Sequence, residues 1–280
     1  MILVTTAGKV GSAAAGLIAQ RDVRVRILVR HPEKAATLAQ AGVEIFPGDL
    51  GSRESIDQAM RGVSAVILVT PPVVQQELSV IDAAQQAGVE HVVKITSKAS
   101  ADSPIARRRN QSEIEQALVA SRLSYTLLRN NAYIHFFLMM AEGIARTSTF
   151  RTATGEGRIG HIDVRDVAAI AAEIAVFSAS HTGKTYWPTG PRSLSGKDVA
   201  EIFTKVLGRP ITFQPISYED QKQAMLDAGL AEPVADDNAR AVALMADSDC
   251  DYVTDDVPQI LSRPAGSFEQ FVIDYAKSFS

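Results

Sequence analysis

Short apolar runs and longer stretches of helical spacing alternate along the first half of the chain. The apolar runs cover residues 1–4, 25–29, 43–46, 65–70, 91–96 and 125–128. Such runs are typical of buried strands, and strands that alternate with helices form parallel sheets because each return needs a crossover. The pattern predicts an α/β fold, a Rossmann-type doubly wound parallel sheet with strand order 3-2-1-4-5-6. A ligand is then expected in the crevice at the carboxyl ends of strands 1 and 4.

Helical spacing continues into the second half of the chain, where the alternation is less regular. Helices are expected from about residue 12 and at residues 32–40, 52–61, 73–87, 106–121, 131–144, 170–177, 195–207, 217–228, 233–245 and 267–278, with a short strand at 184–187. We expect residues 1–150 to form the Rossmann domain and residues 151–280 a smaller, mostly helical lobe on the substrate side. The boundary is approximate, because the chain interleaves the two parts.

The turn between the first strand and the first helix is rich in small residues. Gly8 and Gly11 lie in this turn, and Ser12 is expected to cap the helix. Glycines at such a turn let backbone N–H groups approach a diphosphate at the positive end of the helix. The short-chain dehydrogenase pattern Gly-x-x-Gly-x-x-Gly reads here Thr5-x-x-Gly8-x-x-Gly11. Because β-branched Thr5 disfavours positive φ, we expect the loop to turn without it, with the Thr5 and Thr6 hydroxyls replacing part of the hydrogen bonding.

The charge at the end of the second strand bears on cofactor choice. Arg30 stands there, 19 positions after Gly11, where NAD-preferring proteins usually carry an acid that binds the ribose hydroxyls. An arginine at this place favours the 2′-phosphate of NADPH, and Lys34 supplies a second cation one helical turn later. The alternative is that both are solvated surface residues, as most Arg and Lys side chains are.

Composition excludes several classes of protein. The formal net charge of −4 over 280 residues argues against a broad nucleic-acid-binding surface. The single cysteine, Cys250, cannot form an intramolecular disulfide or a cysteine-rich metal cage, so no metal is expected. No apolar run reaches the length of a membrane span, and the chain starts on a core strand in place of a signal peptide. We therefore expect a cytoplasmic protein with no nucleic-acid or membrane partner.

Several motifs together resemble the NmrA-like group of atypical short-chain dehydrogenases, and within it the NADPH quinone oxidoreductases and triphenylmethane reductases. The matching segments are Val29-Arg30, residues 33–35, 48–50, 125–130, 163–168, 208–210 and 253–256. They run along nearly the whole chain. The resemblance implies that Asp49 hydrogen-bonds the adenine edge while Leu50 packs on the ring. The group contains both reductases and redox sensors that bind a dinucleotide and perform no chemistry.

The expected cofactor is NADPH, with NADH as the alternative. The residues expected to contact it are Thr5, Thr6, Gly8, Lys9, Val10, Gly11, Arg30, Lys34, Asp49, Leu50, Thr70, Pro71, Pro72, Thr96 and Ser97.

The catalytic dyad of ordinary short-chain dehydrogenases, Tyr-x-x-x-Lys, is expected to be absent from the chain. Alignment with the family puts Arg109 and Glu113 at its two positions, and Arg107 to Arg109 are interpreted as a solvated helix start. Ser97 matches the usual serine. The candidate catalytic residues are Ser97, Asn130 and His135, and the candidate substrate-binding residues are Tyr133, His135 and Phe136. Related reductases also lack the dyad, which implies hydride transfer governed by positioning, with the proton supplied by solvent or a nearby donor.

Two functions are compatible with these residues. The first is an NAD(P)H-dependent oxidoreductase that reduces a quinone-like or conjugated aromatic small molecule. The second is a non-catalytic NAD(P)-sensing regulatory protein of the NmrA type. The polar and aromatic residues after the sixth strand favour the enzyme.

Overall fold

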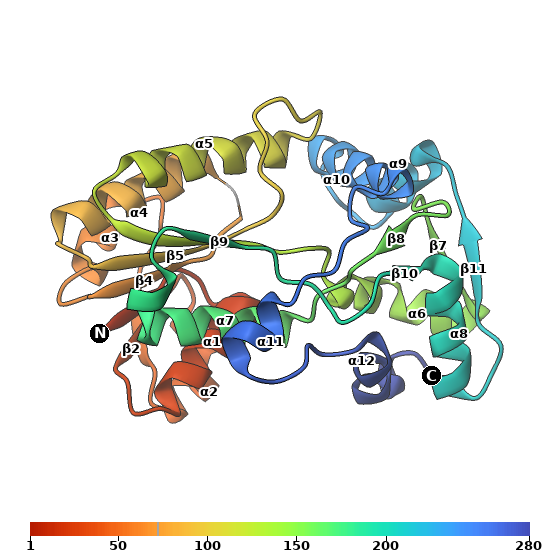
Figure 1. Cartoon of the computed structure of the whole chain (residues 1–280), viewed down its shortest axis with the longest axis horizontal. Helices are drawn as coiled ribbons and strands as arrows, with labels where there is room; N and C mark the ends of the chain where they lie inside the picture. Colours follow the sequence, from red (N-terminus) through yellow and green to blue (C-terminus); the bar gives the residue numbers. More distant parts are fainter. Residues whose placement is uncertain (72) are drawn as a thin grey trace.

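The computed structural model describes residues 1–71 and 73–280. Its centre is a seven-stranded sheet in the order β3-β2-β1-β4-β5-β6-β9, in which every neighbouring pair is parallel (Figure 1). The strands are β1 (Ile2–Val4), β2 (Val25–Val29), β3 (Glu44–Pro47), β4 (Ala65–Leu68), β5 (His91–Thr96), β6 (Ser124–Arg129) and β9 (Lys184–Tyr186). The expected Rossmann order of the first six strands is confirmed. The late strand β9 extends the sheet beside β6, with Thr126 opposite Lys184.

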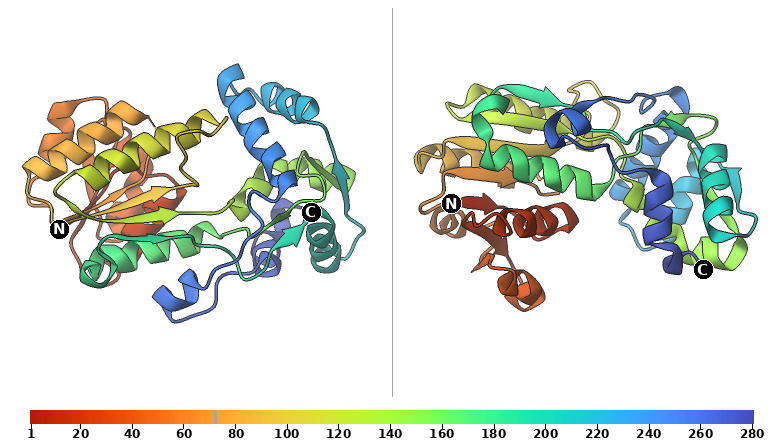
Figure 2. Two further views of the ribbon diagram at one scale, coloured as in Figure 1. Left: turned by 45° about the horizontal axis from the view of Figure 1, so that its top comes forward. Right: turned by 60° about the horizontal axis from the view of Figure 1, so that its bottom comes forward.

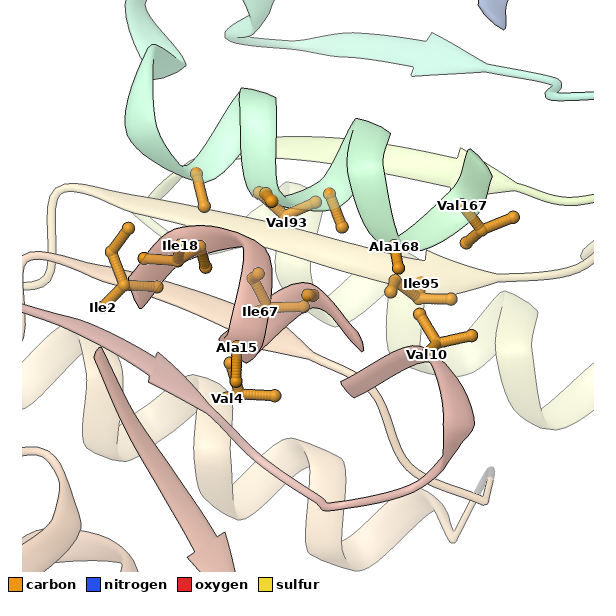
Figure 3. Packing of buried hydrophobic residues seen from close by; sticks show 14 of the residues in the cluster. Ile2, Val4, Val10, Ala15, Ile18, Ile67, Val93, Ile95, Val167 and Ala168 are labelled. Carbon is orange, nitrogen blue, oxygen red and sulfur yellow. The ribbon is translucent and has the colours of Figure 1, made fainter. Parts of the chain in front are cut away.

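Helices cover both faces of the sheet. One face carries α3 (Arg53–Ala59), α4 (Val74–Gln86) and α5 (Ala106–Ala120), and the other carries α1 (Lys9–Ala19), α7 (Val164–Val176) and α11 (Asp256–Leu261) (Figure 1). Alternate strand residues therefore enter different cores: Val4 and Ile67 pack under α1 and α7, whereas Leu3 packs under α3 and α4. Helix α1 lies against α7 and the sheet, with Ile18 and Val10 at the contact (Figure 3).

The remaining elements form a lobe beyond the carboxyl end of the sheet (Figure 2). They are η2 (Ile134–Met140), α6 (Ala141–Thr147), β7 (Thr149–Thr152), β8 (Arg158–Ile159), β10 (Leu194–Ser195), α8 (Gly196–Leu207), β11 (Thr212–Pro215), α9 (Tyr218–Asp227), α10 (Glu232–Leu244), η4 (Met245–Asp247), α12 (Phe268–Asp274) and η5 (Ala276–Ser278). The short segment η3 (Ser178–His181) is not part of the lobe and lies against α7 beside the sheet. Strand β11 pairs with β7, and β10 pairs with β8. An aromatic cluster built on Phe137, Phe203 and Phe268 fills the lobe.

Several boundaries differ from the sequence expectations. The stretch 131–144 is not one helix: a 3₁₀ segment, η2, precedes α6. Residues 32–40 divide in the same way into η1 (Pro32–Ala35) and α2 (Ala36–Gln40). Helix α7 begins before residue 170, because Asp163 caps it by accepting a hydrogen bond from the Arg165 backbone N–H at 2.7 Å. The capping side chain decides the start of this helix, whereas the apolar pattern marks only its middle.

Among the described residues, no helix combines the length and apolar character needed to cross a membrane.

Candidate functional site

The loop from β1 to α1 presents the start of a helix at the carboxyl edge of the sheet. Gly8 is the N-cap, and the first helical hydrogen bond runs from the Ser12 N–H to the Gly8 carbonyl at 2.8 Å. The expectation that Ser12 caps the helix is wrong, because its hydroxyl donates to the Ala7 carbonyl at 3.0 Å. The amides of residues 9–11 precede that first bond, at the positive end of an 11-residue helix. This arrangement suits an anion such as a diphosphate.

The two glycines of this loop have different roles. A Cβ at Gly11 would lie 2.0 Å from the Thr6 carbonyl oxygen, so only glycine allows the loop to pack so closely on the helix. At Gly8 the nearest atom, the Thr6 hydroxyl oxygen, is 4.0 Å away and the residue is exposed. The outer face of Gly8 is therefore open to a ligand.

Thr5 and Thr6 join this loop to the end of β4. The Thr5 hydroxyl donates to the Val69 carbonyl at 3.0 Å and accepts from the Val69 N–H at 2.9 Å. The Thr6 hydroxyl also donates to the Val69 carbonyl, at 2.6 Å. Thr5 is fully buried and is not among the non-glycine residues with positive φ. The loop thus turns without the first glycine, and the two hydroxyls hold it in place.

The residues expected around the adenosine end lie along the same edge. Arg30 directly follows β2, and Arg30 and Lys34 are both exposed. Asp49 is exposed and turns the loop after β3 by accepting from the Gly51 N–H at 2.7 Å. Leu50, in contrast, is buried in the core under α3 and α4.

Thr70 follows β4 on the same edge and is held by a buried ion pair. Its hydroxyl lies 2.6 Å from one oxygen of Glu77, and the other oxygen lies 2.6 Å from the Lys94 ammonium. Neither Glu77 nor Lys94 has any exposed side-chain surface. Burial lowers the pKa of Lys94, although the Glu77 carboxylate acts in the opposite direction. Pro71 is exposed beside Thr70, and Pro72 lies outside the described residues.

The ends of β5 and β6 bring the candidate reaction-site residues together. The Thr96 carbonyl accepts from the Asn130 backbone N–H at 3.1 Å and from its side-chain amide at 3.2 Å. That amide also lies 3.3 Å from the Tyr133 hydroxyl. The Asn130 carbonyl oxygen Oδ1 is buried and is one of the side-chain atoms left without a partner in the described structure. Ser97, half-buried, directly follows β5. The group offers an unused acceptor, Asn130 Oδ1, and a phenol, Tyr133, whose pKa burial raises.

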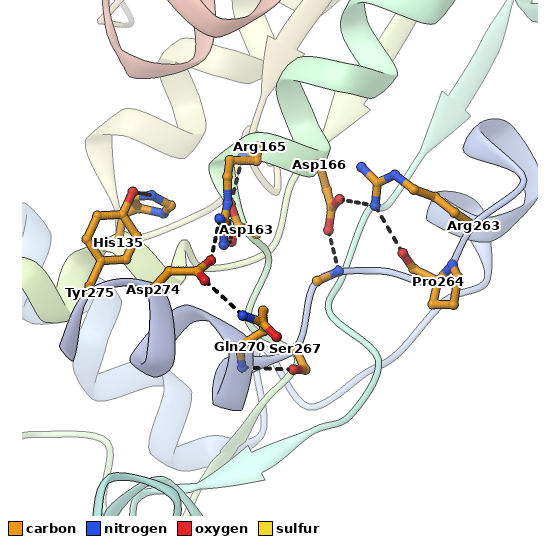
Figure 4. A network of polar contacts seen from close by, with 11 residues as sticks. His135, Asp163, Arg165, Asp166, Arg263, Pro264, Ser267, Gln270, Asp274 and Tyr275 are labelled. Atoms are coloured by element: carbon orange, nitrogen blue, oxygen red, sulfur yellow. Dashed lines mark hydrogen bonds and ion pairs between the residues drawn. The ribbon is translucent and has the colours of Figure 1, made fainter. Parts of the chain in front are cut away.

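His135 lies farther along, where η2 meets α12. Its Nε2 is 3.4 Å from the Tyr275 hydroxyl (Figure 4). Its ring also contacts the rings of Phe271 and Tyr275 edge-on. The other nitrogen, Nδ1, is buried and has no partner among the described residues. Burial lowers the pKa of His135, with Asp163 opposing the effect, and thus favours the neutral ring. Phe136 is turned toward the small core cluster of α9 and α10.

Arg109 and Glu113, the residues aligned with the dyad, are both exposed on α5, and Arg109 donates to the Ser103 carbonyl at 2.6 Å. A Tyr-x-x-x-Lys spacing does occur elsewhere, at Tyr218 and Lys222 on α9, which corrects the expectation that the chain carries no such dyad. The Tyr218 hydroxyl bonds Asp236, and this raises the pKa of Tyr218. A catalytic dyad needs the opposite effect, so this pair is not suited to proton transfer.

The interpretation of Arg107 to Arg109 as a solvated helix start is also wrong for two of the three. Arg108 is 8% exposed, and its guanidinium binds the carboxylate of Asp249. Arg107 donates to the side-chain oxygen of Asn238 at 2.8 Å. Both partners come from the far end of the chain, where sequence spacing carries no information about them.

The chain is similar to known proteins along most of its length. The model of the NmrA-like family matches residues 1–253. The chain belongs to the NmrA-like family. Among its relatives in the family is the NAD(P)H azoreductase of Xenophilus azovorans, 34% identical over all of this chain and 99% of that protein.

Two solved structures of NmrA-like relatives with cofactor are closely similar. The NADPH-dependent quinone oxidoreductase of Escherichia coli, complexed with NADPH, is 27% identical with a TM-score of 0.89, covering 99% of this chain and 100% of that one. The Citrobacter sp. triphenylmethane reductase, complexed with NADP(H), is 27% identical with a TM-score of 0.87 over the same shares.

Replacing Gly11 by alanine should disturb both the loop and the ligand site, because the new Cβ would lie 2.0 Å from the Thr6 carbonyl. We expect a lower melting temperature and a loss of NADPH affinity of at least about tenfold. Gly8→Ala is the matched control, since its Cβ meets open space. It should weaken NADPH binding with little change in melting temperature. Calorimetric titration and thermal denaturation measure both quantities, and equal melting temperatures for the two variants would contradict the assignment.

Replacing Thr5 by valine keeps the shape of the side chain and removes its hydroxyl. The Val69 N–H then loses its buried partner, while the Val69 carbonyl keeps only the Thr6 hydroxyl, which should lower the free energy of unfolding by about 1 to 3 kcal/mol. Thr5→Ser, which keeps the hydroxyl, should lose less. Urea denaturation of the three proteins tests this, and a valine variant as stable as the wild type would show that the two hydrogen bonds contribute nothing.

Proposed function

We propose that this NmrA-like protein is an NAD(P)H-dependent oxidoreductase that uses NADPH to reduce a quinone-like or conjugated aromatic molecule. The observation that carries the proposal is the open helix start at Gly8, flanked on the same sheet edge by the exposed Arg30. The relatives named above are reductases that use a nicotinamide cofactor, and one acts on quinones. They do not favour the alternative of a non-catalytic regulatory sensor.

The residues of the β1–α1 loop fit a dinucleotide. In the proposed site the amides of residues 9–11 bind the diphosphate, while Arg30 and Lys34 bind the 2′-phosphate. The Asp49 carboxylate accepts a hydrogen bond from the edge of the adenine, and Thr70 and Pro71 lie beside the ribose. Asn130 Oδ1 lies at the ends of β5 and β6 and is buried without a partner among the described residues. It can accept a hydrogen bond from the amide group of the bound cofactor. When bound, NADPH supplies a hydride.

The side chains of the proposed site orient the cofactor and the substrate and exclude water. Among the described residues, none is placed as a general acid. Burial raises the pKa of Tyr133, so its phenol stays protonated and releases its proton poorly. The side-chain amide of Asn130 donates a hydrogen bond to this hydroxyl. A quinone that accepts a hydride needs one further proton to become the hydroquinone, and its oxygens take that proton from water. Electron-poor aromatics therefore suit a site that lacks the dyad.

The cofactor preference depends on Arg30. A charge-assisted phosphate contact contributes about 1.5 to 3 kcal/mol, so the wild type should prefer NADPH over NADH by about tenfold or more. Arg30→Ala should remove most of this preference. Arg24→Ala is the control, because Arg24 is also exposed but precedes β2 at the opposite edge of the sheet. Calorimetry with both cofactors decides, and equal affinities in the wild type would refute the phosphate role.

The chemistry is tested with NADPH deuterated at nicotinamide C4, on each face in turn, and a panel of quinones and azo or triphenylmethane dyes. We expect a primary isotope effect for one face in single-turnover reduction. Arg109→Ala and Glu113→Gln should change turnover by well under the 10²- to 10⁴-fold that a positioned general acid contributes. If tightly bound NADPH is oxidised by no member of the panel, the protein is a sensor and not a reductase.

A further inference from the structure

Lys98, Arg108 and Asp249 form a charged cluster where β5 ends, called here the Asp249 cluster. The Lys98 ammonium lies 2.7 Å from one carboxylate oxygen of Asp249. The Arg108 guanidinium binds both oxygens, one of them at 3.0 Å. Lys98 stands two residues beyond β5, and Arg108 is in the first turn of α5. A fork of two guanidinium donors plus an ammonium is the arrangement that binds a carboxylate, sulfonate or phosphate.

The Asp249 cluster lies at the proposed reaction site. The backbone carbonyl of Cys250, the next residue, accepts from the side-chain amide of Asn131 at 3.1 Å. Asn131 follows Asn130, whose side chain bonds the end of β5 at Thr96. The cluster is thus tied to the ends of both β5 and β6, and Figure 1 shows the start of α5 facing α10 at this edge.

The cluster carries one excess positive charge, because two cations share a single carboxylate. The neighbouring Asp237 carboxylate accepts from the backbone N–H groups of Ala106 at 2.5 Å and Arg107 at 3.2 Å, and the Arg107 guanidinium beside it carries the opposite charge, so this pair leaves the excess charge of the cluster unchanged. The Lys98 side chain is 42% exposed, whereas those of Arg108 and Asp249 are 10% and 14% exposed. The solvent side of the cluster is therefore its positive side.

We propose that the Asp249 cluster is a specificity site for an acidic group on the substrate, with the Asp249 carboxylate holding its place when no substrate is bound. This rests on the proposed reductase function and narrows it. The substrate is a planar, electron-poor aromatic molecule that carries a carboxylate or sulfonate. Its anionic group binds Lys98 and Arg108 as the Asp249 side chain rotates away, while the backbone of the segment stays tied to Asn131.

The test compares a neutral and an anionic quinone, 1,4-naphthoquinone and 1,4-naphthoquinone-2-sulfonate. Each variant is compared with the wild type on the same quinone, so that the different reduction potentials of the two quinones cancel. Arg108→Gln and Lys98→Gln should each lower kcat/KM for the sulfonate about tenfold, through KM, and change it less than about twofold for the neutral quinone. Asp249→Asn should raise kcat/KM for the sulfonate alone. Arg108→Lys, which keeps the charge, should retain part of the kcat/KM for the sulfonate that Arg108→Gln loses.

Asp237→Asn is the matched control, because it weakens the attachment of α10 to α5 without removing a cation from the cluster. It should affect both quinones equally. Melting temperatures confirm that each variant is folded. If the neutral quinone is reduced but every variant changes both quinones by the same factor, the specificity site is refuted and the reductase stands.

Direct binding separates the two proposals further. Naphthalene-2-sulfonate, which cannot be reduced, should bind the NADPH-loaded wild type at least about tenfold more tightly than the NADPH-loaded Arg108→Gln variant in calorimetric titration. Equal affinities would overturn the specificity site whether or not the quinones turn over. If neither quinone oxidises bound NADPH, the proposed function fails on its own evidence.

Discussion

Strands β1 and β4 are hydrogen-bonded neighbours at the centre of the sheet, and the helices that follow them pack on opposite faces. Ile2 is opposite Ala65 and Val4 is opposite Ile67. Because the chain leaves the two strands in different directions, their loops separate at the carboxyl edge of the sheet. Thr5 strengthens this pairing beyond the last strand residue by bonding both backbone groups of Val69. The same hydrogen bonds hold the glycine loop before α1 next to Thr70, the residue that follows Val69.

A buried ion pair between Glu77 and Lys94 holds Thr70 in place at the end of β4. Glu77 and Lys94 are fully buried and neutralise each other, and Glu77 also receives the Thr70 hydroxyl. Removing one member of such a pair typically costs about 3 to 5 kcal/mol, because the other charge stays desolvated. Glu115 and Arg129 form a second pair on the same face, and Arg129 also stacks on Trp187 at 5.1 Å. Replacing Glu77 or Lys94 alone is therefore expected to destabilise the fold next to Thr70.

Polar contacts join α10 and the segment after it to the start of α5. The apolar cluster of α9 and α10 is small and centred on Ala235, Ala239 and Val242. Asp237 supplies the cap that the start of α5 lacks, since the N-cap Ile105 has no side chain able to accept a hydrogen bond. Asp249 and Asn238 then engage two arginines in the first turn of α5. Charged and polar contacts therefore join α10, and through it α9, to the start of α5.

Local pattern determined much of this protein: the strand order, the glycine loop and Arg30 at the end of β2 all follow from neighbouring residues, because hydrogen bonding and side-chain periodicity act over a few positions. Two local predictions were wrong. Ser12 does not cap α1, and residues 131–144 form a 3₁₀ segment followed by a short α-helix in place of one helix. Only the tertiary structure could pair Arg108 with Asp249, 141 residues apart, or show that Gly11 is required by the Thr6 carbonyl. Such contacts depend on how whole elements pack, and an exposed arginine and a buried one look the same in a sequence.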